Sequence, residues 1–157
     1  MKQILVSTVM CREGVTARPK MLLYEAAASM YGHGINGLPV VDEDSRVVGM
    51  LGIKDIVRVL FRTGDEVSIS IASPRRCLAA YLRDLRVRDV MAVRLLCVRP
   101  DDTLRVVVSL LCNHGVHPIP VVDDDRHLVG VVGRADVLGV MLSTDRAQSG
   151  AALRGRG

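Results

Sequence analysis

The stretches HGINGLPVVD (residues 33–42) and HGVHPIPVVD (residues 114–123) are nearly the same sequence, 81 positions apart. They share an initial His-Gly and a final Pro-Val-Val-Asp. The same offset, without a gap, pairs Val9-Met10 with Val90-Met91 and the segment 49–55 with 130–136. A register that holds over about fifty residues indicates an internal duplication, which fixes the architecture of the chain.

The composition predicts a compact protein with an aliphatic core. The chain has 157 residues, of which 49% are hydrophobic, with no Trp, one Phe and three Tyr. This length suits one domain or two small fused half-domains. There is no CxxC spacing among the four Cys, no signal-peptide pattern and no apolar run long enough to cross a bilayer, so a cytoplasmic location is expected.

Arginine carries most of the positive charge. The net charge is +4, and many of the arginines fall between residues 75 and 105. An arginine-rich stretch is either a solvated surface or a surface that binds anions such as nucleic acid. Few aromatic side chains are available to stack on bases, which favours the first interpretation.

Cys112, His114 and His117 could form a metal site on spacing alone. Their mates at the 81-residue offset are Tyr31, His33 and Asn36, so the first copy lacks the ligand set. The sequence therefore favours no metal site.

Each copy has the same predicted order of elements. A short extended piece with the Val-Met pair precedes a helix, whose apolar spacing is i, i+3, i+4, i+7 from Leu23 or Leu104. The helix ends at Gly34 or Gly115, a residue type suited to the left-handed cap conformation. Two strands follow, at 38–41 and 47–51 or at 119–122 and 128–132, joined by an acidic turn. A second helix then runs to about residue 61 or 142.

These elements define a mixed α/β (α+β) fold with two β-α-β-β-α repeats. The predicted boundaries are 4–62 for the first repeat, 63–85 for a linker with a helix, and 86–143 for the second repeat. Residues 144–157 are rich in Gly and Arg without an apolar period, which predicts a mobile tail.

The sequence resembles a tandem pair of CBS domains, or Bateman module, of the stand-alone kind. The segments that carry the resemblance are VSTVM and VRDVM, then GINGLPVVDEDSRVVGMLGIKDIV and GVHPIPVVDDDRHLVGVVGRADVL. They span about residues 4–142. The pattern is specific because it occurs twice.

The resemblance implies a regulatory binding module that needs no cofactor, and not an enzyme. In this family the two repeats are related by a pseudo-twofold axis with their sheets packed together. The cleft between them binds adenosine-containing ligands such as AMP, ADP, ATP or S-adenosylmethionine. Modules of this family commonly form homodimers and regulate a partner protein.

Asp55 and Asp136 each follow the predicted start of a second helix by three residues. A carboxylate there is stabilised by the helix dipole by about 0.3–1 kcal/mol, so each can be a helix cap alone. In similar CBS proteins this Asp also binds the ribose hydroxyls, and we expect that role for at least one of the two.

Gly52 and Gly133 stand where the family pattern has Ser or Thr. Without that hydroxyl, phosphate binding rests on the helix N-terminal N–H groups. Lys54 and Arg134 could replace the missing contact, and both are otherwise ordinary solvated helix residues.

The other candidate ligand contacts follow from the resemblance and lie at the start of each hairpin and just before each Arg-Pro pair. They are Gly34, Leu38, Pro39, Gly115, His117, Ile119, Pro120, Thr16 and Cys97. Because His117 and Pro118 replace Asn36 and Gly37, we expect the two sites to differ in affinity. The second is favoured because Arg134 can contact an anion bidentately.

Three functions remain open at this stage. The favoured function is sensing of an adenosine-containing ligand; the alternatives are a dimeric interaction module without ligand and an arginine-dependent nucleic-acid binder. The sequence has no Ser/His/Asp set, paired catalytic carboxylates or phosphate-loop motif, which disfavours an enzyme.

Overall fold

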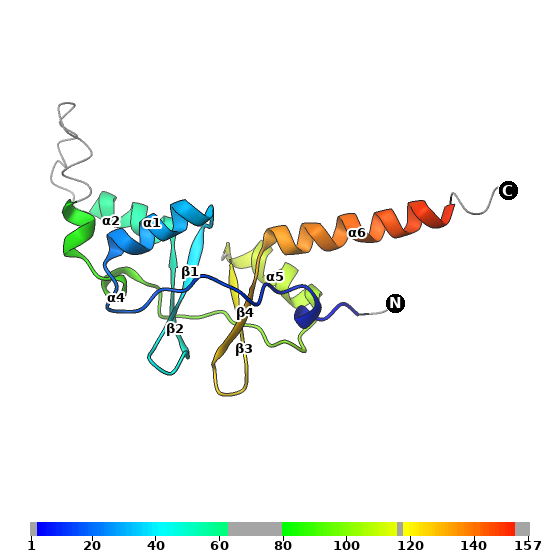
Figure 1. Cartoon of the computed structure of the whole chain (residues 1–157), viewed down its shortest axis with the longest axis horizontal. Helices are drawn as coiled ribbons and strands as arrows, with labels where there is room; N and C mark the ends of the chain where they lie inside the picture. The colour runs from blue at the N-terminus through cyan, green and yellow to red at the C-terminus, as the bar shows by residue number, and fades with distance from the viewer. Residues whose placement is uncertain (1–2, 63–79, 116–117, 153–157) are drawn as a thin grey trace, which may run out of the picture. The chain divides into compact units, whose positions relative to one another are not determined.

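The computed structural model describes residues 3–62, 80–115 and 118–152 of the chain (Figure 1). The elements run in the order η1 (Val6–Thr8), α1 (Leu23–His33), β1 (Gly37–Val41), β2 (Val47–Gly52), α2 (Ile53–Arg62), α4 (Val87–Val90), α5 (Leu104–His114), β3 (Ile119–Val122), β4 (Leu128–Val132) and α6 (Arg134–Ala152). The predicted mixed α/β class with two equivalent repeats is confirmed.

Each repeat is built around one antiparallel hairpin. Strand β1 pairs with β2 and β3 with β4, and the register of the first hairpin runs from Gly37–Gly52 to Val41–Val47 with a bulge at its turn end. The Asp42 carboxylate accepts hydrogen bonds from the Asp44 and Arg46 amides, at 3.0 and 2.9 Å. The acidic segment is therefore a turn held by its first side chain, as predicted.

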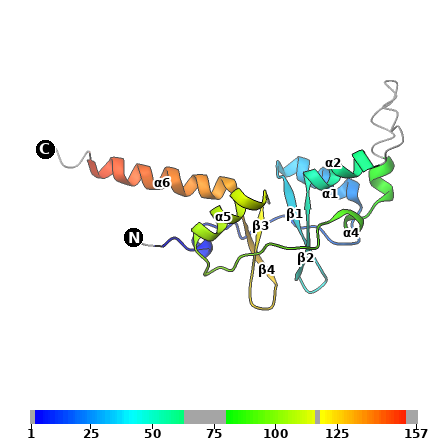
Figure 2. The ribbon, with the colours of Figure 1, turned by 180° about the vertical axis from the view of Figure 1, so that it is seen from behind.

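The first helix of each repeat buries the predicted apolar face. Leu23, Ala26 and Met30 are buried on α1. The helix ends at Gly34, whose φ and ψ are 63° and 32°, and Gly115 ends α5 at 59° and 17°. These left-handed conformations confirm the predicted caps. Figure 2 shows α1 and α2 side by side along one side of the first hairpin.

One edge of each hairpin is covered by the chain that leads into the same repeat's first helix. Ala17 forms a parallel bridge with Val40, and its N–H donates to the Pro39 carbonyl at 2.9 Å. Val98 bridges Val121 in the same way, and its N–H donates to Pro120 at 3.0 Å. The predicted Thr16 and Cys97 positions therefore lie directly beside the first strand of their hairpins.

The other edge of each hairpin is covered by the opening segment of the other repeat. Cys11 forms an antiparallel bridge with Val131 of β4, with N–O distances of 2.8 and 2.9 Å. Ala92 bridges Met50 of β2 through bonds of 2.8 and 3.0 Å. The first residues of each repeat thus complete the sheet of the other, and Figure 1 shows the blue N-terminal segment beside α5.

We call these opening segments the exchanged segments. They also contact the starts of the first helices and the hydrophobic cores. The Leu104 N–H at the start of α5 donates to the Ile4 carbonyl at 2.8 Å, and Leu23 at the start of α1 donates to Leu85 at 2.9 Å. Val6 is fully buried in the core of the second repeat, and Val87 is fully buried in the core of the first. A helix end leaves backbone N–H groups unpaired, and the exchange supplies acceptors for them.

A strand glycine in each hairpin makes room for the exchanged segment. A Cβ on Gly130 would lie 2.9 Å from the Cys11 carbonyl oxygen, and one on Gly49 would lie 2.5 Å from the Met91 sulfur. Those distances are shorter than a carbon contact allows. The repeated glycine is therefore explained by the close approach of the other repeat's opening segment.

The chain consequently forms two compact units that do not follow the repeat boundaries. One consists of residues 1–14, 96–124 and 129–157, and the other of residues 15–95 and 125–128. The first is named the α5–α6 unit and the second the α1–α2 unit. The boundaries of the two repeats are predictions from the sequence, whereas the two units are defined by the packing of the folded chain.

Two predicted elements differ from the structure. The prediction of an extended segment at the Val-Met pairs is wrong for Val90, which lies in helix α4. The β-bridges are formed by Cys11 and Ala92 instead. The final helix does not end near residue 142, because α6 continues to Ala152. Residues 80–84 are helical, and 63–79 and 153–157 lie outside the described residues.

The segment exchange predicts that a core mutation in one repeat loosens the other. Val6→Ala should lower the free energy of unfolding by about 2 kcal/mol, because two buried methyl groups are lost. Native-state hydrogen exchange should show the loss of protection at α5, β3 and β4. The matched Val87→Ala variant should instead expose α1, β1 and β2. Loss of protection confined to each mutation's own repeat would contradict the exchange.

Candidate functional site

The predicted carboxylates cap the second helix of each repeat. Asp55 Oδ2 accepts a hydrogen bond from the Gly52 N–H at 2.9 Å, and Asp136 Oδ2 accepts one from the Gly133 N–H at 2.7 Å. Each glycine is the residue before the helix, so the carboxylate reaches back from the third helical position. The capping interpretation is confirmed for both residues, and one oxygen of each carboxylate is used by it.

The second carboxylate oxygens have different surroundings in the two repeats. Asp55 Oδ1 lies 3.7 Å from the guanidinium of Arg58, one helical turn later. The equivalent of Arg58 in the second repeat is Gly139. Asp136 therefore has no ion-pair partner within the described ranges, and its Oδ1 is left with its full capacity to accept hydrogen bonds.

Each carboxylate lies in the wall of a cavity, and the two cavities are equivalent under the duplication. The α2 cavity has a volume of about 90 Å³ and is lined by Asp55, Arg58, Val59, Asp89 and Val90. The α6 cavity has a volume of about 710 Å³ and is lined by Ile4, Thr8, Val9, Ala135, Asp136, Gly139, Val140 and Ser143. Asp55, Arg58, Val59, Asp89 and Val90 correspond to Asp136, Gly139, Val140, Thr8 and Val9.

The structure brings the hairpin entrance next to the second helix in the first repeat. The Ile53 N–H donates to the Asn36 carbonyl at 3.0 Å, and a Cβ on Gly52 would lie 3.8 Å from that oxygen. The predicted segment from Gly34 to Pro39 therefore meets the predicted helix start at Gly52. In the second repeat the equivalent position is His117, which lies outside the described residues.

Other predicted contacts are in the core or only partly accessible. Leu38, Pro39, Ile119 and Pro120 are buried, and the Leu38 and Ile119 side chains are fully enclosed in the two hydrophobic clusters. Thr16 and Cys97 are half-buried. Leu38 and Ile119 can therefore offer a ligand backbone groups, whereas their side chains stabilise the fold. Their ligand role stays a prediction.

The two predicted cationic residues are exposed in the first turns of α2 and α6. Lys54 and Arg134 are not equivalent, because the mate of Lys54 is Ala135 and the mate of Arg134 is Ile53. Neither lines the cavity beside the nearby carboxylate. Arg134 is two residues from Asp136, a spacing that places the side chains on different faces of a helix.

Sequence reasoning missed the residues that the exchange delivers to these cavities. Thr8 and Val9 belong to the first repeat by sequence, and they line the cavity of the second. The 81-residue offset pairs them with Asp89 and Val90 in the α2 cavity, so the equivalence was present in the sequence. It could not be assigned to a site without knowing that the opening segments are exchanged.

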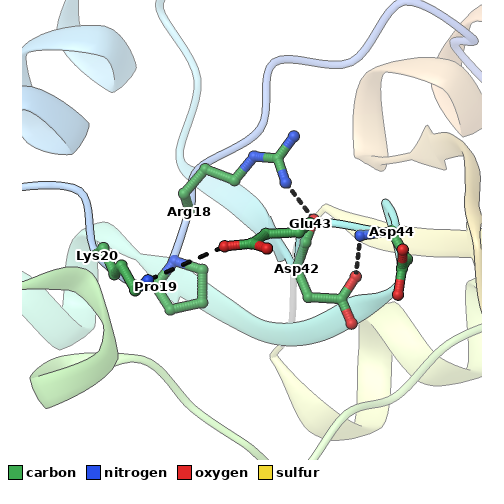
Figure 3. Close-up of a pocket in the computed structure, with 6 residues that line it drawn as sticks. All are labelled: Arg18, Pro19, Lys20, Asp42, Glu43 and Asp44. Atoms are coloured by element: carbon green, nitrogen blue, oxygen red, sulfur yellow. Dashed lines mark hydrogen bonds and ion pairs between the residues drawn. The ribbon is translucent and has the colours of Figure 1, made fainter.

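A third cavity, of about 640 Å³, lies at the turn of the first hairpin and carries charges of both signs (Figure 3). It is lined by Arg18, Pro19, Lys20, Asp42, Glu43 and Asp44. Arg18 donates to the Asp42 carbonyl, and Lys20 Nζ lies 3.9 Å from Glu43. The lining has two cations and three carboxylates, and one of these carboxylates, Asp42, is used by the turn. Arg18 and Lys20 contact groups of the same turn, so neither cation is set apart for a ligand.

Many of the arginines are used within the chain. Arg86 donates to the Lys20 carbonyl at 2.7 Å, and Arg83 lies 4.5 Å from the centre of the Tyr24 ring. Arg99 pairs with Asp124, and Arg88 lies 3.9 Å from Asp89. Contacts of this kind reduce the number of guanidinium groups available to a polyanion. They favour the interpretation of a solvated surface.

The described residues contain no group of His, Cys, Asp and Glu arranged to hold a metal ion. Within the same part of the chain, every helix is too short or too polar to cross a bilayer.

The duplicated arrangement of helices and strands coincides with two matches to the model of one family. The CBS domain model matches the chain twice, at residues 6–62 and 87–143. These two matches cover most of the chain, and the protein belongs to the CBS domain family.

Curated relatives include both proteins of similar size and much longer enzymes. The chain is 27% identical to an uncharacterized protein, MJ1426, of Methanocaldococcus jannaschii, over 69% of this chain and 74% of that protein. It is 27% identical to MK0525 of Methanopyrus kandleri, over 89% of this chain and 64% of that protein. It is 25% identical to the inosine-5′-monophosphate dehydrogenase of M. jannaschii, over 83% of this chain but 22% of that enzyme.

Solved structures of CBS pairs share the fold over nearly their whole length. CBSX2 from Arabidopsis thaliana has a TM-score of 0.78 at 22% identity, with coverage of 92% of this chain and 99% of that one. The CBS domain pair of protein MJ0100, in complex with 5′-methylthioadenosine and S-adenosyl-L-methionine, has a TM-score of 0.73 at 23% identity, with coverage of 91% and 99%. CBSX2 in complex with AMP has a TM-score of 0.72 at 24% identity, with coverage of 90% and 98%.

The capping bond predicts a measurable stability contribution from Asp136. Asp136→Ala should lower the free energy of unfolding by about 1 kcal/mol, because the Gly133 N–H loses its acceptor. Asp136→Asn keeps an amide oxygen at the same place and should lose less. Urea denaturation of the three proteins measures the difference. An alanine variant as stable as the wild type would show that the cap contributes nothing.

Proposed function

We propose that the protein is a ligand-sensing module that binds an adenosine-containing molecule through the carboxylate at the start of its second helices, and that binding modulates a partner protein. The observation that carries this proposal is the geometry of Asp136. One of its oxygens is held by the Gly133 N–H, and the residue lies in the wall of a cavity of about 710 Å³. Cavities of roughly 300–1,000 Å³ accommodate small molecules.

A carboxylate fixed in this way is suited to a vicinal diol. The cap holds the side chain in one orientation, so the second oxygen accepts hydrogen bonds without further ordering of the side chain. Ribose presents two neighbouring hydroxyl donors. The expected binding of the diol by Asp136 thus coexists with the structural role, because the two roles use different oxygens.

The solved CBS pairs with bound ligands support the chemical class. The MJ0100 pair was solved with 5′-methylthioadenosine and S-adenosyl-L-methionine, and CBSX2 was solved with AMP. All three ligands contain adenosine. They differ at the 5′ position, so the element that they share is the nucleoside. The preference for one 5′ group over another would depend on the side chains of each particular protein.

Calorimetric titration with adenosine, AMP, ADP, ATP and S-adenosylmethionine tests the proposal. We expect saturable binding of at least one of them. Asp136→Asn should weaken it by about 10- to 100-fold, because a hydrogen bond to a charged group contributes about 1.5–3 kcal/mol. In that variant the amide oxygen can keep the cap, and the NH₂ group then presents donors to the ribose hydroxyls in place of an acceptor.

Asp101→Asn is the matched control, because this exposed residue changes the charge of the same unit outside the cavity. It should bind the ligand like the wild type. Absence of binding by all five compounds at millimolar concentration would rule out the proposed function.

A homodimeric interaction module is the second candidate, and α6 favours it. Leu138, Met141 and Leu142 are 55%, 65% and 59% exposed. Their i, i+3, i+4 spacing forms one apolar stripe. A second copy that presents the same stripe could cover it through a twofold interface.

Analytical ultracentrifugation tests this second candidate. The wild type should sediment as a dimer, and Met141→Glu should shift it towards the monomer, because a charge would be buried at the contact. Val93→Glu is the control, since Val93 is 69% exposed and lies outside the helices. A wild-type monomer, or a Met141→Glu dimer as stable as the wild type, would remove α6 as the interface.

A further inference from the structure

The two equivalent cavities have the same backbone frame and very different volumes. The α2 cavity measures about 90 Å³ and the α6 cavity about 710 Å³. Both begin at a capping carboxylate and both are completed by an exchanged segment. The described lining residues of the two cavities differ in their side chains at equivalent positions.

The decisive change is at the helical position one turn after the carboxylate. In α2 this position is Arg58, which lines the cavity and lies near Asp55 Oδ1. In α6 it is Gly139, which has no side chain, and a Cβ there would meet no atom within 4 Å. On the opposite wall, Asp89 of the first site is replaced by Thr8, a shorter and uncharged residue. Arg58 therefore adds a cationic side chain to the wall of the α2 cavity at a position where the α6 cavity has none.

The polar side chains of the α6 cavity offer a ligand only hydrogen-bond acceptors. The Thr8 hydroxyl donates its hydrogen to the Leu5 carbonyl at 2.7 Å, and the Ser143 hydroxyl donates to the Gly139 carbonyl at 2.8 Å. Both hydroxyl oxygens therefore keep lone pairs that can accept a hydrogen bond from a ligand. Asp136 Oδ1 is an acceptor as well. A ligand that bonds to these side chains must supply the donors.

The charge of the cavity has one sign. Among the described residues that line it, Asp136 is the only charged side chain, and the others are Ile4, Thr8, Val9, Ala135, Gly139, Val140 and Ser143. The N-terminal end of α6 would ordinarily attract an anion. Here the Asp136 carboxylate accepts from the Gly133 N–H and places a negative charge at that end of the helix. A phosphate group in this cavity would face a carboxylate without a neighbouring cation.

We infer that the α6 cavity is the ligand site of this protein and that it selects an uncharged or cationic adenosine derivative over a nucleoside phosphate. The inference rests on the proposed function and specifies its ligand. The ribose diol donates to Asp136 Oδ1, and the apolar walls from Ile4, Val9 and Val140 contact the uncharged remainder. The α2 cavity, of about 90 Å³ and with Arg58 beside its carboxylate, takes no nucleoside.

The test compares ligands that differ only at the 5′ position. 5′-Methylthioadenosine carries a small neutral methylthio group there, and AMP carries an anionic phosphate. Isothermal titration should give 5′-methylthioadenosine an affinity at least about tenfold higher than that of AMP, and added salt should narrow the gap because the repulsion is screened. A stoichiometry of one per chain is expected.

Gly139→Arg tests the location. It rebuilds the arrangement of α2, fills the cavity and neutralises Asp136, so it should abolish the binding of 5′-methylthioadenosine. The variant should fold, because the position is open and Arg favours helix more than Gly does. Gly32→Arg is the matched control, since Gly32 lies in α1 and a Cβ there also meets no atom within 4 Å. It should bind like the wild type.

The outcomes separate this inference from the proposed function. If AMP binds as tightly as 5′-methylthioadenosine, the selectivity is wrong and the proposed function stands. If Gly139→Arg binds 5′-methylthioadenosine like the wild type, the assignment to the α6 cavity is wrong. If the wild type binds no adenosine derivative at all, both the inference and the proposed function fall.

Discussion

The exchange of opening segments between the two repeats is the contact on which the rest of the structure depends. A two-stranded hairpin is marginal by itself, and its outer strand offers unpaired backbone groups. The bridge from Cys11 to Val131 and the bridge from Ala92 to Met50 pair those groups. They place Val6 and Val87 in the core of the other repeat. Neither repeat therefore has a complete core or a fully covered hairpin without residues from the other.

This constraint also explains why the two candidate sites contain residues from both halves of the sequence. The carboxylate comes from the last helix of one repeat, and the opposite wall comes from the opening segment of the other. A duplication linked in this way keeps two sites with the same backbone frame. Divergence of single side chains, as between Arg58 and Gly139, is then sufficient to change one site without disturbing the fold of the other.

The capping carboxylates connect stability with binding. The glycines before α2 and α6 have no side chain to cap the helix, and the Asp three residues later accepts from the glycine N–H instead. The bond restrains the carboxylate and leaves its second oxygen for another partner. In α2 that partner is Arg58, whose side chain is 62% exposed, so the pair is only a weak source of stability. In α6 no such partner is present among the described residues, and the oxygen remains available to a ligand.

The sequence by itself determined the duplication, the class of fold and most of the element positions. Short-range patterns are sufficient for these features: the apolar spacing from Leu23, the left-handed glycine at Gly34 and the acidic turn at Asp42 all act within a few residues. It also identified Asp55 and Asp136 as caps, because the relation of each to its glycine is local. Only the tertiary structure decided which repeat each opening segment completes, and therefore that Thr8 shares a cavity with Asp136. That pairing joins residues more than a hundred positions apart, and no local pattern specifies it. The physical reason is that it depends on which exposed strand edge the segment pairs with and which core its valine enters, and those partners exist only once the chain has folded.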